Sequence, residues 1–266
     1  MKPLRTAAVL GAGAVGRALR AELPRAGVKV VAAWTRSSGK PLPELRDAEV
    51  IFLAVPDGAV GPLCKQLQVQ RGQLVVHLAG ALPLKPLQPA LRRGARTGSL
   101  HPLRAFVKKG PTSFAGAAAG LSGSDATARA QLAQLARRLG LMALNVRDES
   151  RALYHAAAVL AAGCQVALFS EAQRAFRKAT RTSEPASRAA LLPLSLGALE
   201  KLRHAPAARA LTGPVVRGDT GTIAAHRKAL PGDLLPLYDL LTRISQKMVP
   251  VTIFKETDPN PKVGDS

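Results

Sequence analysis

The sequence has few cysteines, few aromatic residues and no long apolar run. Its two cysteines, Cys64 and Cys164, are too few for a disulfide framework or a zinc cluster, and fit free thiols in a reducing cytoplasm. No stretch approaches the roughly 18 apolar, charge-free residues that cross a bilayer, and the apolar start at 7–15 is too short for a signal peptide. We therefore expect a cytoplasmic protein without a membrane partner.

Acidic residues are also scarce, with 17 Asp and Glu against 38 Lys and Arg, which gives a net charge of +21. Such a balance is compatible with nucleic-acid binding. However, the basic residues are spread along the chain, aromatic residues for base stacking make up only 3%, and no helix-turn-helix, zinc-finger or aromatic RNA-binding signature is present. Nucleic acid is thus an unfavoured partner. The basic surface could instead attract a phosphorylated cofactor or an acidic substrate.

The 266 residues are 47% hydrophobic, enough for one or two folded domains. In the first half, short apolar runs alternate with amphipathic segments, which is typical of a parallel sheet covered on both faces by helices. The predicted strands are 6–10, 28–34, 49–55, 73–78 and 95–100, with 114–121 and 141–146 as further candidates. From about residue 148, alanine-rich helical patterns follow. We predict an α/β protein: a sheet domain over 1–147, an all-helical domain over 148–250 and a flexible tail over 251–266.

A glycine-rich motif joins the first predicted strand to the first predicted helix: Gly11-Ala12-Gly13-Ala14-Val15-Gly16. In this setting the G-x-G-x-x-G spacing predicts dinucleotide binding. The first glycine permits a tight turn, the second lets the backbone approach a pyrophosphate, and the third allows close helix–strand packing. The helix directs its free amide groups at the phosphates. The alternative is a vestigial fold that binds nothing.

The residues after the second and third strands indicate which cofactor is bound. Thr35-Arg36-Ser37 lacks the carboxylate that usually holds an NAD ribose, and an arginine between hydroxyls suits the 2′-phosphate of NADP. The alternative is an exposed loop arginine. Val55-Pro56-Asp57 ends the third strand, where ligands of open α/β sheets lie, although Asp57 could equally cap the next helix.

Five histidines are present, and their spacing matches no metal-binding motif, so we predict no metal. His77 and His101 lie at predicted sheet ends, and His155 follows Tyr154 at the start of a long helix. A histidine can exchange protons near neutral pH, which makes His155 the best candidate for a proton donor in hydride chemistry. Alternatively, His155 caps or fills a domain interface.

Six motifs occur together in one order: Gly11–Gly16, Val55–Asp57, His77-x-x-Gly80, Ser99-Leu100-His101-Pro102, Leu153–Ala158 and Ala210–Asp219. Over about residues 5–248 they resemble Rossmann-like proteins whose C-terminal half is the domain of unknown function 2520. The resemblance implies a Rossmann domain followed by a helical domain, often dimeric. In architecture these proteins are similar to pyrroline-carboxylate reductases, hydroxyacid dehydrogenases and deazaflavin-dependent NADP oxidoreductases. The resemblance implies no substrate.

This chain departs from the family pattern at two places. Ala79 stands where the family usually has serine, and Ala162-Gly163 stands where it usually has Ser-Asn. His155 and Ala162 lie two turns apart on one helix face, so this face has lost polar groups that could hold a substrate. Catalysis by the family's usual residues is therefore in question, whereas cofactor binding is unaffected.

The sequence supports two main interpretations. The first is an NADP-dependent oxidoreductase that acts on a small polar or anionic substrate in an interdomain cleft and forms homodimers through the helical domain. Its candidate catalytic residues are His155 and Asp219, and its candidate substrate-binding residues are His77, Gly80, His101, Tyr154, Thr212 and Arg217. The second is a non-catalytic dinucleotide-binding sensor or scaffold. Structural alternatives remain for the last motif: an Arg217–Asp219 ion pair, and a helix end at Thr212-Gly213.

Overall fold

The computed structural model describes residues 2–106 and 113–249, so the predicted tail at 251–266 lies outside the described residues. The chain divides into two compact units, the first ending at Ala162 and the second beginning at Gly163. The sequence pattern predicts the boundary at 147. The difference is helix α5, Arg151–Ala161, which belongs to the first unit and bonds to the sheet through Arg151 and Tyr154 in its first turns.

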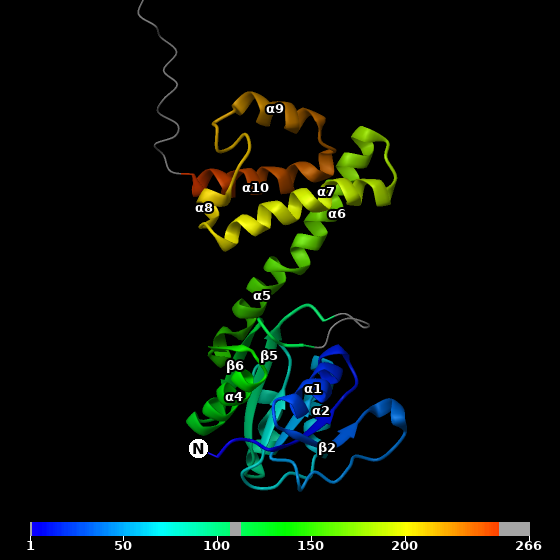
Figure 1. Ribbon diagram of the computed structural model, residues 1–266, viewed down its shortest axis with the longest axis vertical. Coiled ribbons are helices and arrows are strands. Elements are labelled where there is room, and N and C mark those ends of the chain that lie inside the picture. The colour runs from blue at the N-terminus through cyan, green and yellow to red at the C-terminus, as the bar shows by residue number, and fades with distance from the viewer. Residues whose placement is uncertain (1, 107–112, 250–266) are drawn as a thin grey trace, which may run out of the picture. The chain divides into compact units, whose positions relative to one another are not determined.

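The first unit contains a seven-stranded sheet in the order β2-β1-β3-β4-β5-β6-β7. Figure 1 labels three of its strands, β2, β5 and β6. Neighbouring strands are parallel except β5 and β6, so the predicted α/β class with a Rossmann-type sheet is confirmed. In the described residues no helix lies between β5 and β6, and an antiparallel pair needs no crossover helix. The strands are β1 Thr6–Leu10, β2 Lys29–Trp34, β3 Val50–Leu53, β4 Leu74–His77, β5 Arg96–Leu103, β6 Ala118–Gly123 and β7 Met142–Asn145.

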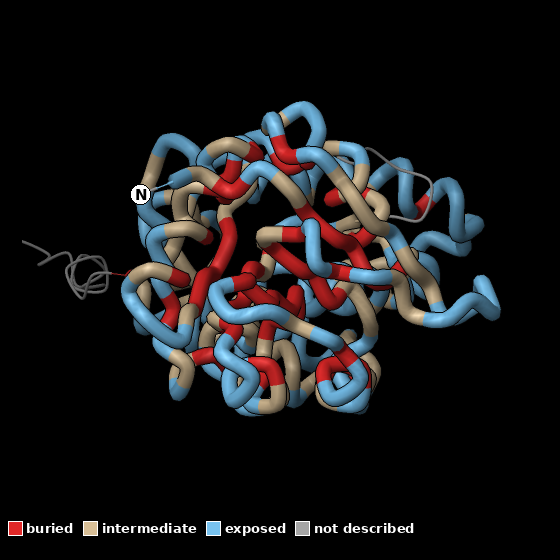
Figure 2. Tube along the Cα trace, turned by 90° about the horizontal axis from the view of Figure 1, so that it is seen from below, coloured by how far each residue is buried: buried red, intermediate tan, exposed pale blue. Residues whose placement is uncertain are grey.

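Helices cover both faces of this sheet and create two apolar clusters. One cluster joins the strands to α1 and α4, and the other joins them to α2 and α3. Strands β1, β3 and β4 are buried on both sides, which explains their near-continuous apolar sequences. Figure 2 shows the buried segments within a layer of more exposed ones. The helices are α1 Ala14–Arg25, α2 Asp57–Gln66, α3 Gln88–Arg92 and α4 Ala126–Arg138, and short 3₁₀ turns include η1 Arg36–Ser38, η2 Lys85–Leu87 and η3 Asp148–Ser150.

In its described residues the second unit contains helices and connecting turns and no strand. Its α-helices are α6 Gly163–Thr180, α7 Glu184–Glu200, α8 Ala207–Ala210, α9 Thr220–Ala229 and α10 Leu235–Met248, with turns η4 Lys201–Arg203 and η5 Gly232–Leu234. Within the described part, only Ser187, Leu234 and Val249 are buried. Large apolar side chains are instead exposed along α6 and α7, among them Val166 at 72% and Leu194 at 70%. This unit has very little apolar core of its own.

The expectation that no long apolar run exists is wrong. Within the described residues, one helical stretch, Asp148–Thr180, has the length and composition to cross a membrane. From residue 152 to residue 170 the sequence contains no Asp, Glu, Lys or Arg. Its hydrophobicity is easily underestimated because alanines, rather than long aliphatic residues, dominate it. The backbone is interrupted at Ala162, with φ −127° and ψ −75°, so α5 and α6 are two helices.

Candidate functional site

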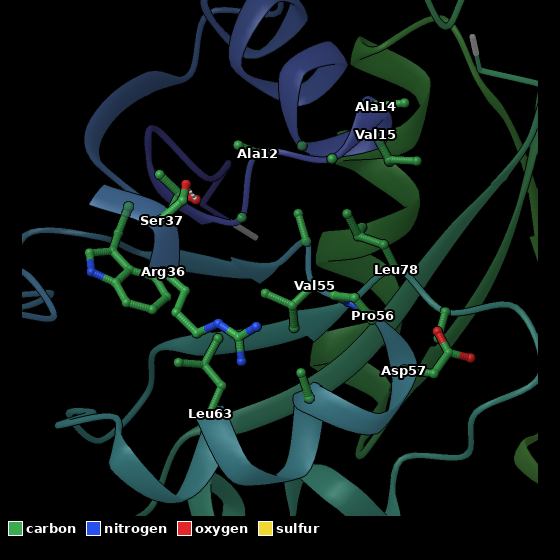
Figure 3. Close-up of a pocket in the computed structure, with 18 of the residues that line it drawn as sticks. Ala12, Ala14, Val15, Arg36, Ser37, Val55, Pro56, Asp57, Leu63 and Leu78 are labelled. Carbon is green, nitrogen blue, oxygen red and sulfur yellow. Dashed lines mark hydrogen bonds between the residues drawn. The ribbon is translucent and has the colours of Figure 1, made fainter. Parts of the chain in front are cut away.

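A cavity of about 960 Å³ lies at the carboxyl ends of strands β1 to β4, where open α/β sheets bind ligands. All twelve residues predicted to bind the cofactor line it, and Figure 3 shows several of them around the opening. They are Gly11, Ala12, Gly13, Ala14, Val15 and Gly16 after β1, Thr35, Arg36 and Ser37 after β2, and Val55, Pro56 and Asp57 after β3. The topology thus brings together three segments that are far apart in sequence.

The three glycines of the first loop differ in how much space a side chain would have there. Gly11 has φ +125°, and a Cβ there would collide with the Ala54 carbonyl. A Cβ at Gly16 would come within 2.7 Å of the Gly11 carbonyl oxygen. By contrast, a Cβ at Gly13 would find its nearest neighbour, the Ala54 oxygen, at 4.0 Å. Packing therefore demands Gly11 and Gly16, whereas the absence of a side chain at Gly13 leaves the backbone open to a ligand in the cavity.

The same loop presents a helix N-terminus to the cavity. Gly13 is the N-cap of α1 and provides no side-chain cap, and the first turn contains no acidic residue. The amide groups of that turn are therefore available to an anion, and the helix dipole favours one. These features fit the pyrophosphate of a dinucleotide.

The β2 end of the cavity is basic and carries hydroxyl groups. Thr35 and Ser37 bond to each other through their hydroxyl oxygens at 3.0 Å, and Ser38 Oγ donates to the Thr35 carbonyl at 2.6 Å. Arg36 extends across the opening towards Leu63 of α2 (Figure 3). Asp57 points away from Arg36 and makes no capping hydrogen bond to α2, whose N-cap is Pro56. The segment that follows β2, residues 35–43, contains no carboxylate to compete for a phosphate.

A second group of polar side chains lies beside the β4 end of the cavity. Along β4, Leu74 and Val76 face α1 and α4, while Val75 faces α2 and α3. Alternation along the strands places His77 of β4, Ser99 and His101 of β5, and Ser122 of β6 on the α2–α3 side. His77 is paired with Ser99 across β4 and β5, and Ser99 with Ser122 across β5 and β6, so these residues form one row.

Helix α5 places three side chains against this row. Arg151, Tyr154 and His155 are three and four residues apart, which puts them on one helix face. The Arg151 guanidinium is buried. It donates from Nη1 to Ser122 Oγ at 2.8 Å and from Nη2 to the Ala79 carbonyl at 2.7 Å. We name the six residues His77, Ser99, His101, Arg151, Tyr154 and His155 the histidine cluster.

Tyr154 is held at the centre of the histidine cluster. Its hydroxyl accepts from the Gly120 amide at 3.1 Å and lies 3.0 Å from His101 Nδ1. It also lies 3.3 Å from the His101 carbonyl, which accepts its proton as an alternative to Nδ1. A Cβ at Gly120 would come within 2.5 Å of the Tyr154 hydroxyl, so this glycine makes room for the ring.

His155 lies where the histidine cluster meets the cofactor cavity. Its ring packs edge-on against His101, with centroids 5.5 Å apart. A Cβ at Gly80 would collide with the His155 ring, and Gly80 directly follows Ala79, which lines the cavity. The predicted residues His77, Gly80, His101, Tyr154 and His155 are thus brought together in the first unit.

Burial favours the uncharged form of two imidazoles in the cluster, those of His77 and His101. It lowers the pKa of His77 to about 3, helped by the positive charge of Arg151, and the pKa of His101 to about 4, helped by His155 and Arg151. Neither nitrogen of His77 has a hydrogen-bond partner in good geometry, although the Pro83 carbonyl is close enough to act on its pKa. Burial raises the pKa of Tyr154, so its hydroxyl keeps its proton at neutral pH.

The predicted residues of the last motif lie in the second unit. Asp219 is the N-cap of α9, where its carboxylate accepts from Thr222 N at 2.9 Å and from Thr222 Oγ1 at 2.6 Å. These bonds lower the pKa of Asp219, with the Thr222 hydroxyl as the main cause. Arg217 acts on it through charge alone, since no ion pair joins the two in the described chain. Thr212 precedes Gly213, which has φ +101° and follows α8. Asp219 is thus engaged in capping a helix.

Several residues of the site escaped sequence reasoning. Leu78, Arg104 and Phe106 line the cavity, and Arg151 joins it to the histidine cluster. Arg151 lies one turn before Tyr154 and His155 on the same helix face, but this spacing alone does not indicate its burial. Polar residues at alternate positions of otherwise apolar strands pointed to His77, Ser99 and Ser122. No group of three metal-binding side chains occurs in the described residues.

The C-terminal half of the chain matches a known protein family. Residues 117–244 match the domain of unknown function DUF2520. This match confirms the resemblance carried by the Tyr154-His155 and Thr212–Asp219 motifs. It includes α5, with its three cluster residues, and most of the described second unit. No curated protein matches the sequence.

Solved structures share the fold over nearly the whole chain. A proposed NADP oxidoreductase of Bacteroides fragilis and a protein of Thermotoga maritima each superpose with a TM-score of 0.71 at 22% identity. The alignments cover 92% of this chain and 98% of the first protein, and 91% of this chain and 97% of the second. Plasmodium falciparum pyrroline carboxylate reductase, solved with NADP bound, aligns over 93% of this chain and 99% of its own at TM-score 0.58 and 12% identity. The fold is therefore one used by NADP-binding oxidoreductases.

Proposed function

We propose that this protein is an NADP(H)-dependent oxidoreductase that transfers a hydride to or from a small polar or anionic substrate. The observation that carries the proposal is the continuity of two sites: Ala79 lines the same cavity as Gly11–Gly16 and Arg36, and the next residue, Gly80, contacts the His155 ring of the histidine cluster. A pyrophosphate over the glycine loop and a 2′-phosphate near Arg36 would direct the nicotinamide towards Leu78 and Ala79.

The residues of the chain divide the remaining work. When bound, the cofactor supplies or accepts the hydride. During reduction of a carbonyl or imine, His155 donates a proton to the oxygen or nitrogen while the carbon receives the hydride. His101 and Tyr154, both uncharged, orient the His155 ring and present polar groups to the substrate. Leu78 and Phe106 exclude water from the same end.

The first test is the affinity for NADPH and NADH, measured by calorimetry. We expect NADPH to bind more tightly, because Arg36 pairs with the 2′-phosphate. Tighter binding of NADH would refute the role of Arg36. If neither nucleotide binds, the whole proposal fails.

The second test separates an enzyme from a sensor. NADPH oxidation is followed by absorbance during a screen of aldehydes, ketones and imines, with wild type, His155→Ala and the control His204→Ala. Loss of turnover only in His155→Ala supports the enzyme. Tight NADPH binding without turnover would instead favour the sensor, which Ala79 and Ala162-Gly163 also favour because side chains expected to contact substrate are absent there.

We also propose that the helical unit forms homodimers. A helical unit whose described residues bury only three side chains cannot offset its conformational entropy alone. A lipid bilayer is less suited than a second copy of the chain to cover this apolar surface. The first turns of α5 bond to the sheet, and the charge-free residues that remain, 156–170, would span only about 22 Å as a helix, short of the roughly 30 Å core. A second copy would cover Val166 and Leu194.

A further inference from the structure

The loop between β4 and η2 forms one wall of the cofactor cavity. Leu78 and Ala79 of this loop line the cavity, and Gly80 contacts His155. We define residues 78–84 as the wall loop. Its position decides both the depth of the cavity at the β4 end and the distance between cavity and His155. Whatever holds the wall loop therefore controls the relation between cofactor and proton donor.

One short segment at the start of α5 holds this loop at three points. Arg151 Nη2 donates to the Ala79 carbonyl at 2.7 Å, and the Asp148 carboxylate accepts from the Leu84 amide at 2.9 and 3.1 Å. Between them the His155 ring packs on Gly80. Both ends of the wall loop are thus tied to residues 148–155.

Arg151 is an unusual anchor because it is a buried cation. It is 1% exposed, no ion pair within 4.0 Å neutralises it among the described residues, and its Nε has no hydrogen-bond partner. Burial lowers its pKa, while the negative charges of Asp148 and Asp57 oppose that effect. Keeping such a charge is costly compared with an apolar residue of similar size. Stability alone is therefore a poor explanation for an arginine at this position.

We propose that Arg151 is a positioning residue of the site: by holding the Ala79 carbonyl and Ser122 Oγ together, it fixes the wall loop and sets the contact between Gly80 and His155. This inference rests on the proposed NADP(H) function. It predicts that cofactor affinity depends on the forked geometry of the guanidinium, while protonation of the nearby histidines depends on its charge. The groups that face His101 are Arg151, Tyr154 and His155 on α5 and His77 on β4.

Two substitutions at position 151 separate geometry from charge. Arg151→Lys keeps the charge but cannot fork between Ser122 and Ala79, and Arg151→Met loses both. The matched control is Arg129→Met, because Arg129 also bonds a backbone carbonyl, that of Gly123 at 3.2 Å, but on the exposed surface. The readouts are NADPH affinity by calorimetry and titration of the histidine rings by NMR, with folding checked by circular dichroism.

We expect both Arg151 variants to bind NADPH roughly tenfold more weakly, because each loses one hydrogen bond from a charged group. Arg151→Met should also move the titration of His101 upward, whereas Arg151→Lys should leave it near the wild-type midpoint. Arg129→Met should change neither. A merely structural role would lower thermal stability and leave the NADPH affinity of the folded variants unchanged.

A milder variant keeps the proposal testable if Arg151→Met does not fold. Asp148→Asn removes the charged acceptor for the Leu84 amide at the other end of the wall loop, and should weaken NADPH binding about threefold. If wild type binds NADPH and neither Asp148→Asn nor Arg151→Lys weakens it, the inference is overturned while the proposed function stands. If wild type itself binds no NADPH, the proposed function fails first.

Discussion

Replacing Gly80 with alanine would place a methyl group where the His155 ring now lies. The new Cβ would collide with His155 Cδ2 and lie 2.9 Å from Nε2 and 3.0 Å from His101 Cε1. The Gly80 backbone lies outside the positive-φ region, so alanine adds no backbone strain there. Because carbon atoms in contact prefer about 3.5–4.0 Å, the His155 ring must move by roughly 1 Å.

The cost of this movement should appear in activity more than in stability. His155 is half-buried, so its ring can rotate outward. We therefore expect the free energy of unfolding to fall by about 1 kcal/mol, near the lower end of the range for overpacking. For a unit of this size that corresponds to a fall in Tm of about 2–4 °C. Displacement of a proton donor by 1 Å can lower turnover about a hundredfold.

The assay compares kcat/KM, NADPH affinity and thermal melting for Gly80→Ala and for Gly197→Ala. Gly197 lies in α7, and no atom lies within 4 Å of the position that a Cβ would take there. Alanine at 197 should therefore raise stability by roughly 0.5–1 kcal/mol and leave the site alone. Full turnover by Gly80→Ala, together with an NMR spectrum showing a displaced His155 ring, would refute the assignment of His155 as proton donor.

Four further predictions follow from the same structure. Arg36→Asp should reverse the preference for NADPH over NADH by at least tenfold in calorimetry, and an unchanged preference would contradict a 2′-phosphate site at Arg36. His77 stays neutral in the native state down to about pH 3 but takes up a proton near pH 6.5 when unfolded, so it should make stability fall as pH drops from 7 to 4, by up to about 1.4 kcal/mol per pH unit. His101 adds a similar slope down to about pH 4, so His77→Asn should reduce the total slope in urea titrations without abolishing it. Tyr154→Phe should keep the fold but lower kcat, and wild-type kcat would show that the hydroxyl is dispensable. Val166→Glu should yield monomers in light scattering, whereas Lys178→Glu, at an exposed polar position of the same helix, should not.

The sheet and its nucleotide loop could be predicted because local signals and tertiary structure agree there. The strand Thr6–Leu10 is apolar throughout its last four residues, Gly11–Gly16 has a spacing tied to a specific backbone path, and a helix follows at once. Strands β3 and β4 are shorter than their apolar runs, since Val55 and Leu78 continue the pattern beyond the last paired residue. These residues then line the cavity.

The antiparallel direction of β6 and the position of α5 could not be predicted in the same way. Strand direction depends on the connection, and the amino-acid pattern of Ala118–Gly123 is the same for either direction. Arg151 begins an alanine-rich helix, and its burial depends on Ser122 and Ala79, which are 29 and 72 residues away. Hydrophobic periodicity assigns such a charged residue to solvent.

The different demands on the three loop glycines have a consequence for how this protein can change over time. A lineage that stopped using nucleotides would still be forced by steric exclusion to retain glycine at positions 11 and 16. Position 13 would be released, because its immediate surroundings tolerate a methyl group. Variation at that single site, surveyed among descendants, would record when the ancestral ligand was abandoned.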